Sequence, residues 1–186
     1  MTTTVTKKCT ILFGSPNNHG NTAKLLDEFL RFCPENVDGT LFCAYDLNVF
    51  PCIGCDVCKK TGNCFRKESD DFHKISRSIA ESDALVIAAP LYFLNYPAPL
   101  KTVFDRFQTF FYNRPFKERK SRKAVLLLTG GSGDELGPKY AKETARYVLD
   151  SINFSLVDTV VVKNTDRVLQ IETSACQNAA KRLFEE

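Results

Sequence analysis

The chain has 186 residues, of which 44% are hydrophobic and 25% charged, and its formal net charge is +3. This length suffices for one well-packed domain and is short for two. The mild charge argues against a nucleic-acid-binding protein, which concentrates many more Lys and Arg side chains on one face. The longest apolar runs are too short to span a bilayer, and the first residues lack the apolar core of a signal peptide. We therefore expect a cytoplasmic protein with no nucleic-acid or membrane partner.

Five short apolar segments predict β-strands. The three clearest are residues 9–13, 84–89 and 124–128, which read CTILF, ALVIAA and AVLLL. None of them alternates between apolar and polar residues, and each stops near Gly or Pro, as strands buried on both faces of a parallel sheet do. Two weaker segments, residues 39–47 and 155–162, predict two more strands.

Helical patterns separate these strands and cover residues 21–32, 70–82, 98–111, 139–152 and 173–184. Alternation of strand and helix predicts a parallel sheet that is covered on both faces through right-handed crossovers. The predicted fold class is α/β, a flavodoxin-like doubly wound five-stranded parallel sheet in the order 2-1-3-4-5. We expect a single domain over residues 1–186 with a cysteine-rich loop at 51–65.

The loop after the first strand, GSPNNHGNT at residues 14–22, has the features of a phosphate-binding loop. Gly14 allows a sharp turn, and polar side chains precede a helix whose unpaired N–H groups and partial positive charge favour an anion. Neither a dinucleotide fingerprint nor a P-loop is present in this loop. The alternative is that Asn21 or Thr22 only caps the helix. The candidate residues are Ser15, Asn17, His19, Gly20, Asn21 and Thr22, with a contact role only for His19.

The loops after the third and fourth strands suit a flat aromatic ring. The first of them is a mixed aromatic and polar segment that Pro97 and Pro99 keep rigid, and the second, TGGSGDELGP at 129–138, permits close backbone approach. Core packing of the aromatic residues and a plain flexible turn are the alternatives. The candidate ring-binding residues are Pro90, Leu91, Tyr92, Phe93, Leu94, Asn95, Thr129, Gly130, Gly131 and Ser132.

Four of the chain's eight cysteines lie within the segment PCIGCDVCKKTGNCF at residues 51–65. Their spacing, Cys52, Cys55, Cys58 and Cys64, is of the kind that commonly holds an iron–sulfur cluster, and thiols of the cytoplasm stay reduced. Three alternatives remain open: a structural zinc ion, a disulfide formed on oxidation, and a thiol loop without metal. The other cysteines, Cys9, Cys33, Cys43 and Cys176, are predicted to be small core residues.

Four segments in succession, GSPNNHGNT, PCIGCDVCKKTGNC, AAPLYFLNYPAPLKTVFDR and TGG, resemble the motifs of the NADPH-dependent FMN reductase family. The similarity covers about residues 8–140 and is greatest to the iron–sulfur flavoprotein branch. It implies FMN, with its phosphate on the first loop and its ring against the other two, and a 4Fe-4S cluster on the four cysteines. Where family members often carry an Arg after the Pro of the first loop, this chain has Asn17.

The resemblance implies an oxidoreductase that takes a hydride from NAD(P)H and reduces a quinone, a flavin or another small acceptor. Backbone donors near Gly130, Gly131 and Asn95 would stabilise the reduced flavin, and no side chain is assigned a catalytic role. An electron carrier between ferredoxin and FMN is the alternative. A second alternative is a metal-stabilised protein-interaction domain without flavin. The aromatic stretch VFDRFQTFFYNRPF at 103–116 predicts the face of a homodimer or homotetramer.

Overall fold

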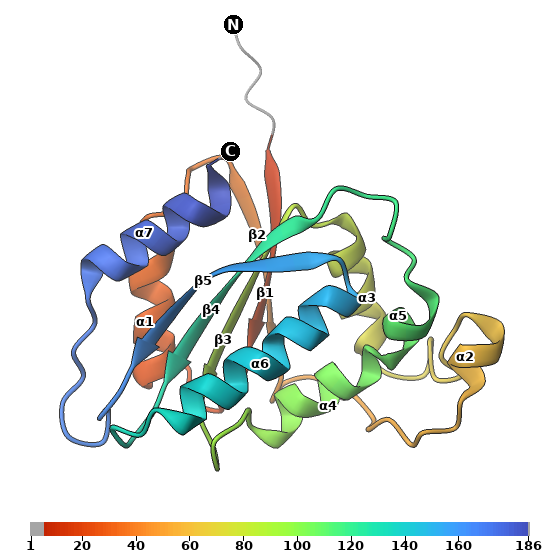
Figure 1. Ribbon diagram of the computed structural model, residues 1–186, viewed down its shortest axis with the longest axis horizontal. Helices are drawn as coiled ribbons and strands as arrows, with labels where there is room; N and C mark the ends of the chain where they lie inside the picture. The colour runs from red at the N-terminus through yellow and green to blue at the C-terminus, as the bar shows by residue number, and fades with distance from the viewer. Residues whose placement is uncertain (1–5, 186) are drawn as a thin grey trace, which may run out of the picture.

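The five predicted strands form one parallel sheet in the computed structural model, which describes residues 6–185 (Figure 1). The strand order is β2-β1-β3-β4-β5, and every neighbouring pair runs parallel, which confirms the predicted fold class. The strands are β1 (Lys7–Phe13), β2 (Val37–Cys43), β3 (Ala84–Pro90), β4 (Arg122–Thr129) and β5 (Phe154–Val162).

Burial explains why three strands were easy to find in the sequence and two were not. In β3, Ala84 to Ala89 are all buried, and in β4 the run from Ala124 to Thr129 is buried. Strands covered on both faces need continuous apolar residues. The edge strand β2 is exposed over most of its length, so its side chains carry only a weak apolar signal.

Two layers of helices cover the sheet. Helices α1 (Asn21–Leu30) and α7 (Thr173–Phe184) pack on one face, where Phe29 and Cys176 belong to the same buried cluster. The other face carries α3 (Phe72–Glu81), α4 (Ala98–Arg106), α5 (Gln108–Asn113) and α6 (Leu136–Ser151). A short helix α2 (Val57–Thr61) lies beside α5 at the edge of the molecule (Figure 1). Within residues 6–185, none of the helices has both the length and the apolar character needed to cross a membrane.

One helical expectation was wrong, and one short helix was not predicted. The single helix predicted over 98–111 is two helices, because the chain bends at Phe107, whose N–H donates to the carbonyl oxygen of Phe104 (3.0 Å). The bend keeps successive rings in the core, where the ring centroids of Phe107 and Phe110 are 5.6 Å apart. Helix α2 was not predicted because none of its residues is buried, which leaves no periodic apolar pattern to detect.

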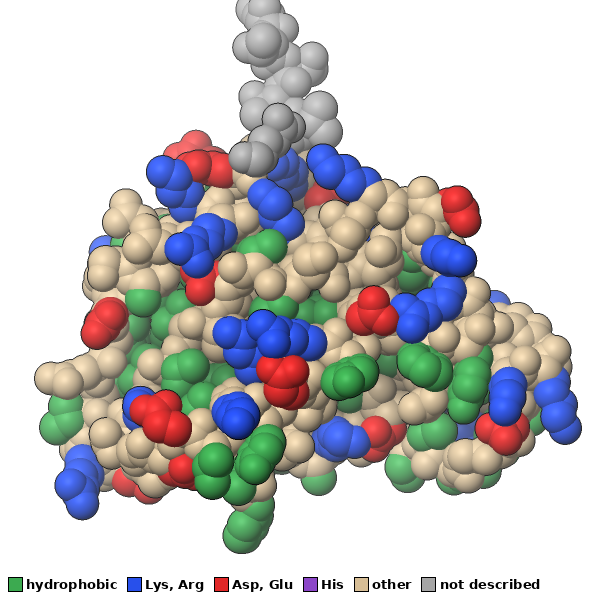
Figure 2. Space-filling view, viewed as in Figure 1, with side chains coloured by type: hydrophobic (Ala, Val, Ile, Leu, Met, Phe, Trp, Pro, Cys, Tyr) green, Lys and Arg blue, Asp and Glu red, His purple; other side chains and the backbone are tan. Residues whose placement is uncertain are grey.

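Only some of the aromatic side chains in the stretch at 103–116 are buried in the core. Phe104, Phe107 and Phe110 are buried, whereas Phe111 and Tyr112 are exposed. Figure 2 shows hydrophobic side chains among charged ones across the face formed by α4, α5 and α6. Association of copies through this face stays a prediction.

Gly14 was expected to allow a sharp turn, but the structure shows that it allows the end of β1 to pack closely against α4. Its backbone is not in the left-handed region that favours glycine. A Cβ at this position would instead lie 2.6 Å from Leu100 Cδ2 and 3.2 Å from Ala89 Cβ. Because Leu100 is fully buried in α4, the contact leaves no room for a side chain.

We expect Gly14→Ala to lower the free energy of unfolding by about 1–3 kcal/mol, because overpacking displaces buried neighbours. Gly39→Ala is the matched control, since its Cβ would meet only Ile11 Cδ1, at an ordinary 3.6 Å. The control should change the free energy of unfolding by less than about 1 kcal/mol. Urea unfolding of both variants measures the difference, and equal midpoints would contradict this role of Gly14.

Candidate functional site

A cavity of about 690 Å³ opens at the carboxyl ends of the strands. The loops after β1, β3 and β4 meet there, as expected for ligand sites at the switch point of an open α/β sheet. All predicted cofactor residues except His19 and Asn95 line it: Ser15, Asn17, Gly20, Asn21, Thr22, Pro90, Leu91, Tyr92, Phe93, Leu94, Thr129, Gly130, Gly131 and Ser132. The volume is in the usual range for a small-molecule site.

The amino terminus of α1 reaches this cavity without a capping side chain. The residue that precedes the helix is Gly20, and the side chains that could have capped it are engaged elsewhere. Asn21 Nδ2 donates to the carbonyl oxygen of Thr165 (3.2 Å), and the hydroxyl of Thr22 pairs with that of Thr129 (2.7 Å). The alternative in which Asn21 or Thr22 only caps the helix is therefore wrong. The first-turn N–H groups and the positive end of the helix dipole remain for an anion.

The loop after β3 forms a two-residue turn at the rim of the cavity. Tyr92 and Asn95 exchange backbone hydrogen bonds of 2.8 and 3.1 Å, and Phe93 and Leu94 between them have φ values of 48° and 66°. Residues other than glycine rarely adopt this left-handed backbone conformation, because it costs energy. Such strained residues are concentrated at functional sites. The side chain of Phe93 is entirely exposed, so the tip of the turn projects from the lower edge of the molecule in Figure 2.

Two of the expected backbone donors are already used within the protein. The N–H of Gly130 donates to the carbonyl oxygen of Val162 (2.8 Å), and the N–H of Asn95 donates to that of Tyr92. Of the three residues named, Gly131 is the remaining candidate donor to a ring. His19 does not line the cavity, and its N–H donates to Asn17 Oδ1 (2.9 Å).

A fourth loop, after β5, completes the wall and was missed by the sequence analysis. Among its residues Lys163, Thr165 and Asp166 line the cavity, and the N–H of Thr165 donates to the carbonyl oxygen of Gly130 (3.0 Å). The carboxyl ends of all parallel strands lie at the same edge of the sheet, so the residues after the fifth strand could have been predicted to line the cavity as well. Other lining residues that were missed are Pro16, Asp134, Gly137 and Pro138.

Formal charges in the cavity favour neither sign strongly. Lys163 is the one cation among the described lining residues, and it forms an ion pair with Glu135. Asp134 and Asp166 supply two carboxylates. Attraction of a phosphate at this site therefore depends on the amino terminus of α1 more than on basic side chains.

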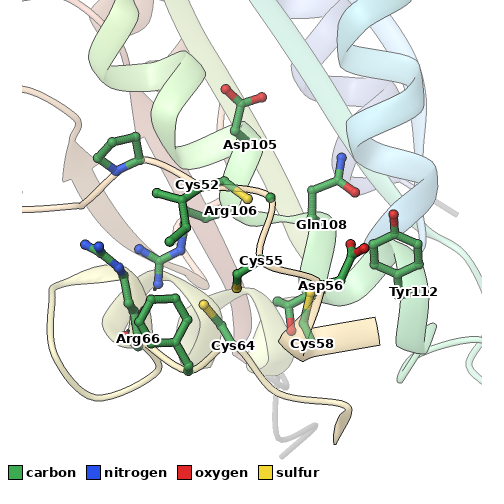
Figure 3. Close-up of a pocket in the computed structure, with 15 residues that line it drawn as sticks. Cys52, Cys55, Asp56, Cys58, Cys64, Arg66, Asp105, Arg106, Gln108 and Tyr112 are labelled. Atoms are coloured by element: carbon green, nitrogen blue, oxygen red, sulfur yellow. Dashed lines mark hydrogen bonds between the residues drawn. The ribbon is translucent and has the colours of Figure 1, made fainter. Parts of the chain in front are cut away.

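The four clustered cysteines line a second cavity, of about 390 Å³ (Figure 3). Gly54 and Gly62 have φ values of 65° and 82°, a backbone conformation that glycine adopts readily and that lets the loop turn at these two positions. All eight cysteines, which lie within the described residues, are free thiols. Burial raises the pKa of the Cys58 thiol, and the nearby Cys64 raises it further. Across residues 6–185, no group of His, Cys, Asp or Glu side chains is arranged to hold a single metal ion.

The remaining cysteines are packing residues, as predicted. Cys9, Cys43 and Cys176 are buried, and Cys33 is half-buried against the same core. Burial raises the pKa of Cys9 to about 12 and that of Cys33 to about 11. Thiols that do not ionise near neutral pH are poor nucleophiles and poor metal ligands.

Helix α4 connects the two cavities. Leu100, in its first turn, lies against Gly14, the residue before Ser15 of the first cavity, and Arg106, its last residue, lines the cysteine cavity. The helix runs from Ala98 to Arg106, so its ends are about 12 Å apart along the axis at 1.5 Å per residue.

Residues 8–166 match the model of the NADPH-dependent FMN reductase family, and the chain therefore belongs to this family. An iron–sulfur flavoprotein of Archaeoglobus fulgidus is 30% identical over 128 residues, which are 67% of this chain and 56% of that protein. One of Methanocaldococcus jannaschii is 35% identical over 94 residues, 50% of this chain and 48% of that protein. The chain thus matches about half the length of these relatives. An NAD(P)H:quinone oxidoreductase from Methanothermobacter marburgensis shares the fold, with a TM-score of 0.74, 21% identity and 98% of each chain covered.

The hydroxyl pair of Thr22 and Thr129 predicts a non-additive double-mutant cycle. Both residues are almost fully buried, at 2% and 3% exposure. Thr22→Val or Thr129→Val alone leaves one buried hydroxyl unpaired, and each should cost about 1–3 kcal/mol of unfolding free energy. The double variant should be close to the wild type, because both polar groups are then removed. Denaturant unfolding of the four proteins checks this, and additive losses would show that the pair does not connect the two loops.

Proposed function

We propose that this protein is an FMN-dependent oxidoreductase that takes a hydride from NAD(P)H and passes the electrons to a quinone, a flavin or another small acceptor. When bound, FMN supplies the redox chemistry, since it accepts a hydride and releases its electrons onward. The protein residues bind and orient the cofactor. No side chain that lines the cavity is required as an acid or base.

The observation that carries the proposal is the uncapped amino terminus of α1 inside the large cavity. Gly20, Asn21 and Thr22 line the cavity there, and no side chain among the described residues forms a capping hydrogen bond at this helix start. A phosphate ester fits such a place because it accepts several hydrogen bonds and carries negative charge. The turn at Tyr92–Asn95 and the loop at Gly130–Ser132 lie across the same cavity, where they would bracket the ring.

Charge at the helix start provides the test. Gly20 has φ −77° and ψ −175°, a conformation that Asp and Asn adopt readily at the position before a helix. Both Gly20→Asp and Gly20→Asn place a capping side chain at the proposed phosphate site, but only Asp adds a negative charge. We expect Gly20→Asp to bind FMN about tenfold more weakly than Gly20→Asn, which corresponds to about 1.4 kcal/mol of repulsion.

Riboflavin, which lacks the phosphate, is the control ligand for this experiment. It should bind the two variants with equal affinity, because the added charge then faces no phosphate. Quenching of flavin fluorescence measures all four affinities. Equal FMN affinities in the two variants would place the phosphate elsewhere, and no FMN binding by the wild type would remove the proposed activity.

A second candidate function is an iron–sulfur flavoprotein that relays electrons between ferredoxin and FMN. Four thiols line one cavity, and a cubane cluster takes each thiolate at a different iron atom, so its ligands need not converge on one ion. A tetrahedral zinc site needs all ligands around one centre, which the thiols do not provide as they stand. The ligands would be Cys52, Cys55, Cys58 and Cys64. The relatives from Archaeoglobus fulgidus and Methanocaldococcus jannaschii, which are named iron–sulfur flavoproteins, support the same proposal.

Anaerobic purification followed by measurement of iron, sulfide and flavin tests the cluster separately from the flavin. We expect the wild type to hold iron and acid-labile sulfide in equal amounts and Cys58→Ser to lose most of both. Cys33→Ser, a change at a half-buried packing thiol, should retain them. Flavin without iron would leave a plain FMN reductase, and iron without flavin would favour a metal-stabilised interaction domain.

A further inference from the structure

The cysteine loop, residues 51–65, has almost no hydrophobic anchorage of its own. None of its residues is buried, and most of it has no regular secondary structure apart from α2. Burial of apolar surface is the usual force that fixes a segment on a protein. Other interactions must therefore hold this loop in place and with it the four thiols.

A buried ion pair stands beside the loop. The side chains of Arg106 and Asp70 are 1% and 0% exposed and contact each other directly. Arg106 also lies over the ring of Phe72, at 4.7 Å from the centroid. Burying two charges is costly unless further hydrogen bonds satisfy them. The other hydrogen-bond partners of Arg106 and Asp70 therefore identify the segments that this ion pair fixes in place.

Those partners are the two ends of the cysteine loop. Arg106 Nη1 donates to the carbonyl oxygen of Phe50 (2.9 Å), and its Nη2 donates to that of Arg66 (3.5 Å). Asp70 accepts the N–H of Phe50 (3.0 Å) and, through its other oxygen, the N–H of Phe72 (3.1 Å). Phe50 precedes the loop and Arg66 follows it. One guanidinium thus joins both ends of the loop to the last turn of α4.

The middle of the loop is held by a third residue. Asn113, the last residue of α5, donates from Nδ2 to the carbonyl oxygen of Thr109 in its own helix (2.6 Å) and to that of Gly62 in the loop (2.8 Å). The carbonyl oxygen of Cys58 lies 3.3 Å from the same nitrogen and shares these two hydrogens. The loop is therefore attached at both ends and between its third and fourth cysteines. In Figure 3 the guanidinium groups of Arg66 and Arg106 lie on one side of the cysteine side chains.

We propose that Arg106, Asp70 and Asn113 are positioning residues that hold the four thiols around their cavity in the protein without metal. The identity of the ligand that the thiols would bind, an iron–sulfur cluster, rests on the second candidate function. The positioning of the thiols does not. Preorganisation of a loop reduces the ordering cost that a ligand must otherwise meet. The planar fork of arginine suits the role, because it reaches Asp70 and two carbonyl groups in fixed directions, which a lysine ammonium does not.

A comparable arginine elsewhere supplies the matched control. Arg122 donates to three carbonyl oxygens, those of Ile79, Ser82 and Ile152, and, like Arg106, it lies over an aromatic ring, with its guanidinium 4.0 Å from the Phe154 ring centroid. Like Arg106, it leaves its Nε buried without a partner. Arg122 contacts no part of residues 51–65 in these bonds, so Arg122→Lys should weaken the fold without loosening the cysteine loop.

The experiment measures iodoacetamide alkylation of each cysteine by mass spectrometry, on reduced protein freed of metal and flavin. In Arg106→Lys we expect Cys58 and Cys64 to react at least about tenfold faster than in the wild type, because local opening of the loop exposes them. The core thiols Cys9 and Cys176 report global unfolding, and their rates should stay unchanged. In Arg122→Lys the loop thiols Cys58 and Cys64 should react at the same rate as in the wild type, even where the weakened fold makes the core thiols react faster.

Two results would overturn the proposal. One is an equal rate at Cys58 and Cys64 in Arg106→Lys and the wild type, and the other is acceleration of loop and core thiols in the same proportion. Asn113→Ala decides the case if Arg106→Lys does not fold, since Asn113 is only half-buried. We expect faster alkylation of Cys58 in this variant with no change in the unfolding midpoint, and an unchanged rate would contradict the proposal. Because neither flavin nor metal is present, failure here is distinguishable from failure of the proposed redox function.

Discussion

The parallel pairing of five strands is the constraint on which the rest of this structure depends. Parallel strands need crossovers through helices, and these crossovers bring every strand end to the same edge of the sheet. The loops after β1, β3, β4 and β5 meet at that edge around one cavity, although they are separated by many residues in the chain. The continuous apolar character of β3 and β4 stabilises this arrangement, because both strands are buried on both faces.

The anion site that we propose in the cavity consists mainly of backbone groups. Lys163 is paired with Glu135, and two carboxylates line the same space. The amino terminus of α1 keeps its partial positive charge and its N–H groups available, because the side chains that could cap it bond to other loops. The absence of an arginine at position 17 is thus consistent with a phosphate site that depends on helix geometry.

The two cavities share one structural support. Helix α4 contacts the end of β1 through Leu100 and the cysteine loop through Arg106. It begins directly after the turn that forms one wall of the first cavity. A helix of nine residues is a rigid spacer, so the position of the cysteine loop relative to the sheet is set by packing of α4 in the core. This explains how a loop without buried residues keeps a defined place.

The sequence by itself determined the fold class, the strand order, and most of the residues that line the large cavity. These features depend on local patterns, since continuous apolar runs, Gly and Pro at strand ends and the rule for parallel strands are all readable along the chain. Tertiary structure decided the rest. Whether Thr22 caps its helix depends on Thr129, the packing of Phe107 at the bend depends on the ring of Phe72, and the anchorage of the cysteine loop depends on a pair formed by Asp70 and Arg106. Each of these is a contact between residues distant in sequence, so no local pattern could encode its partner.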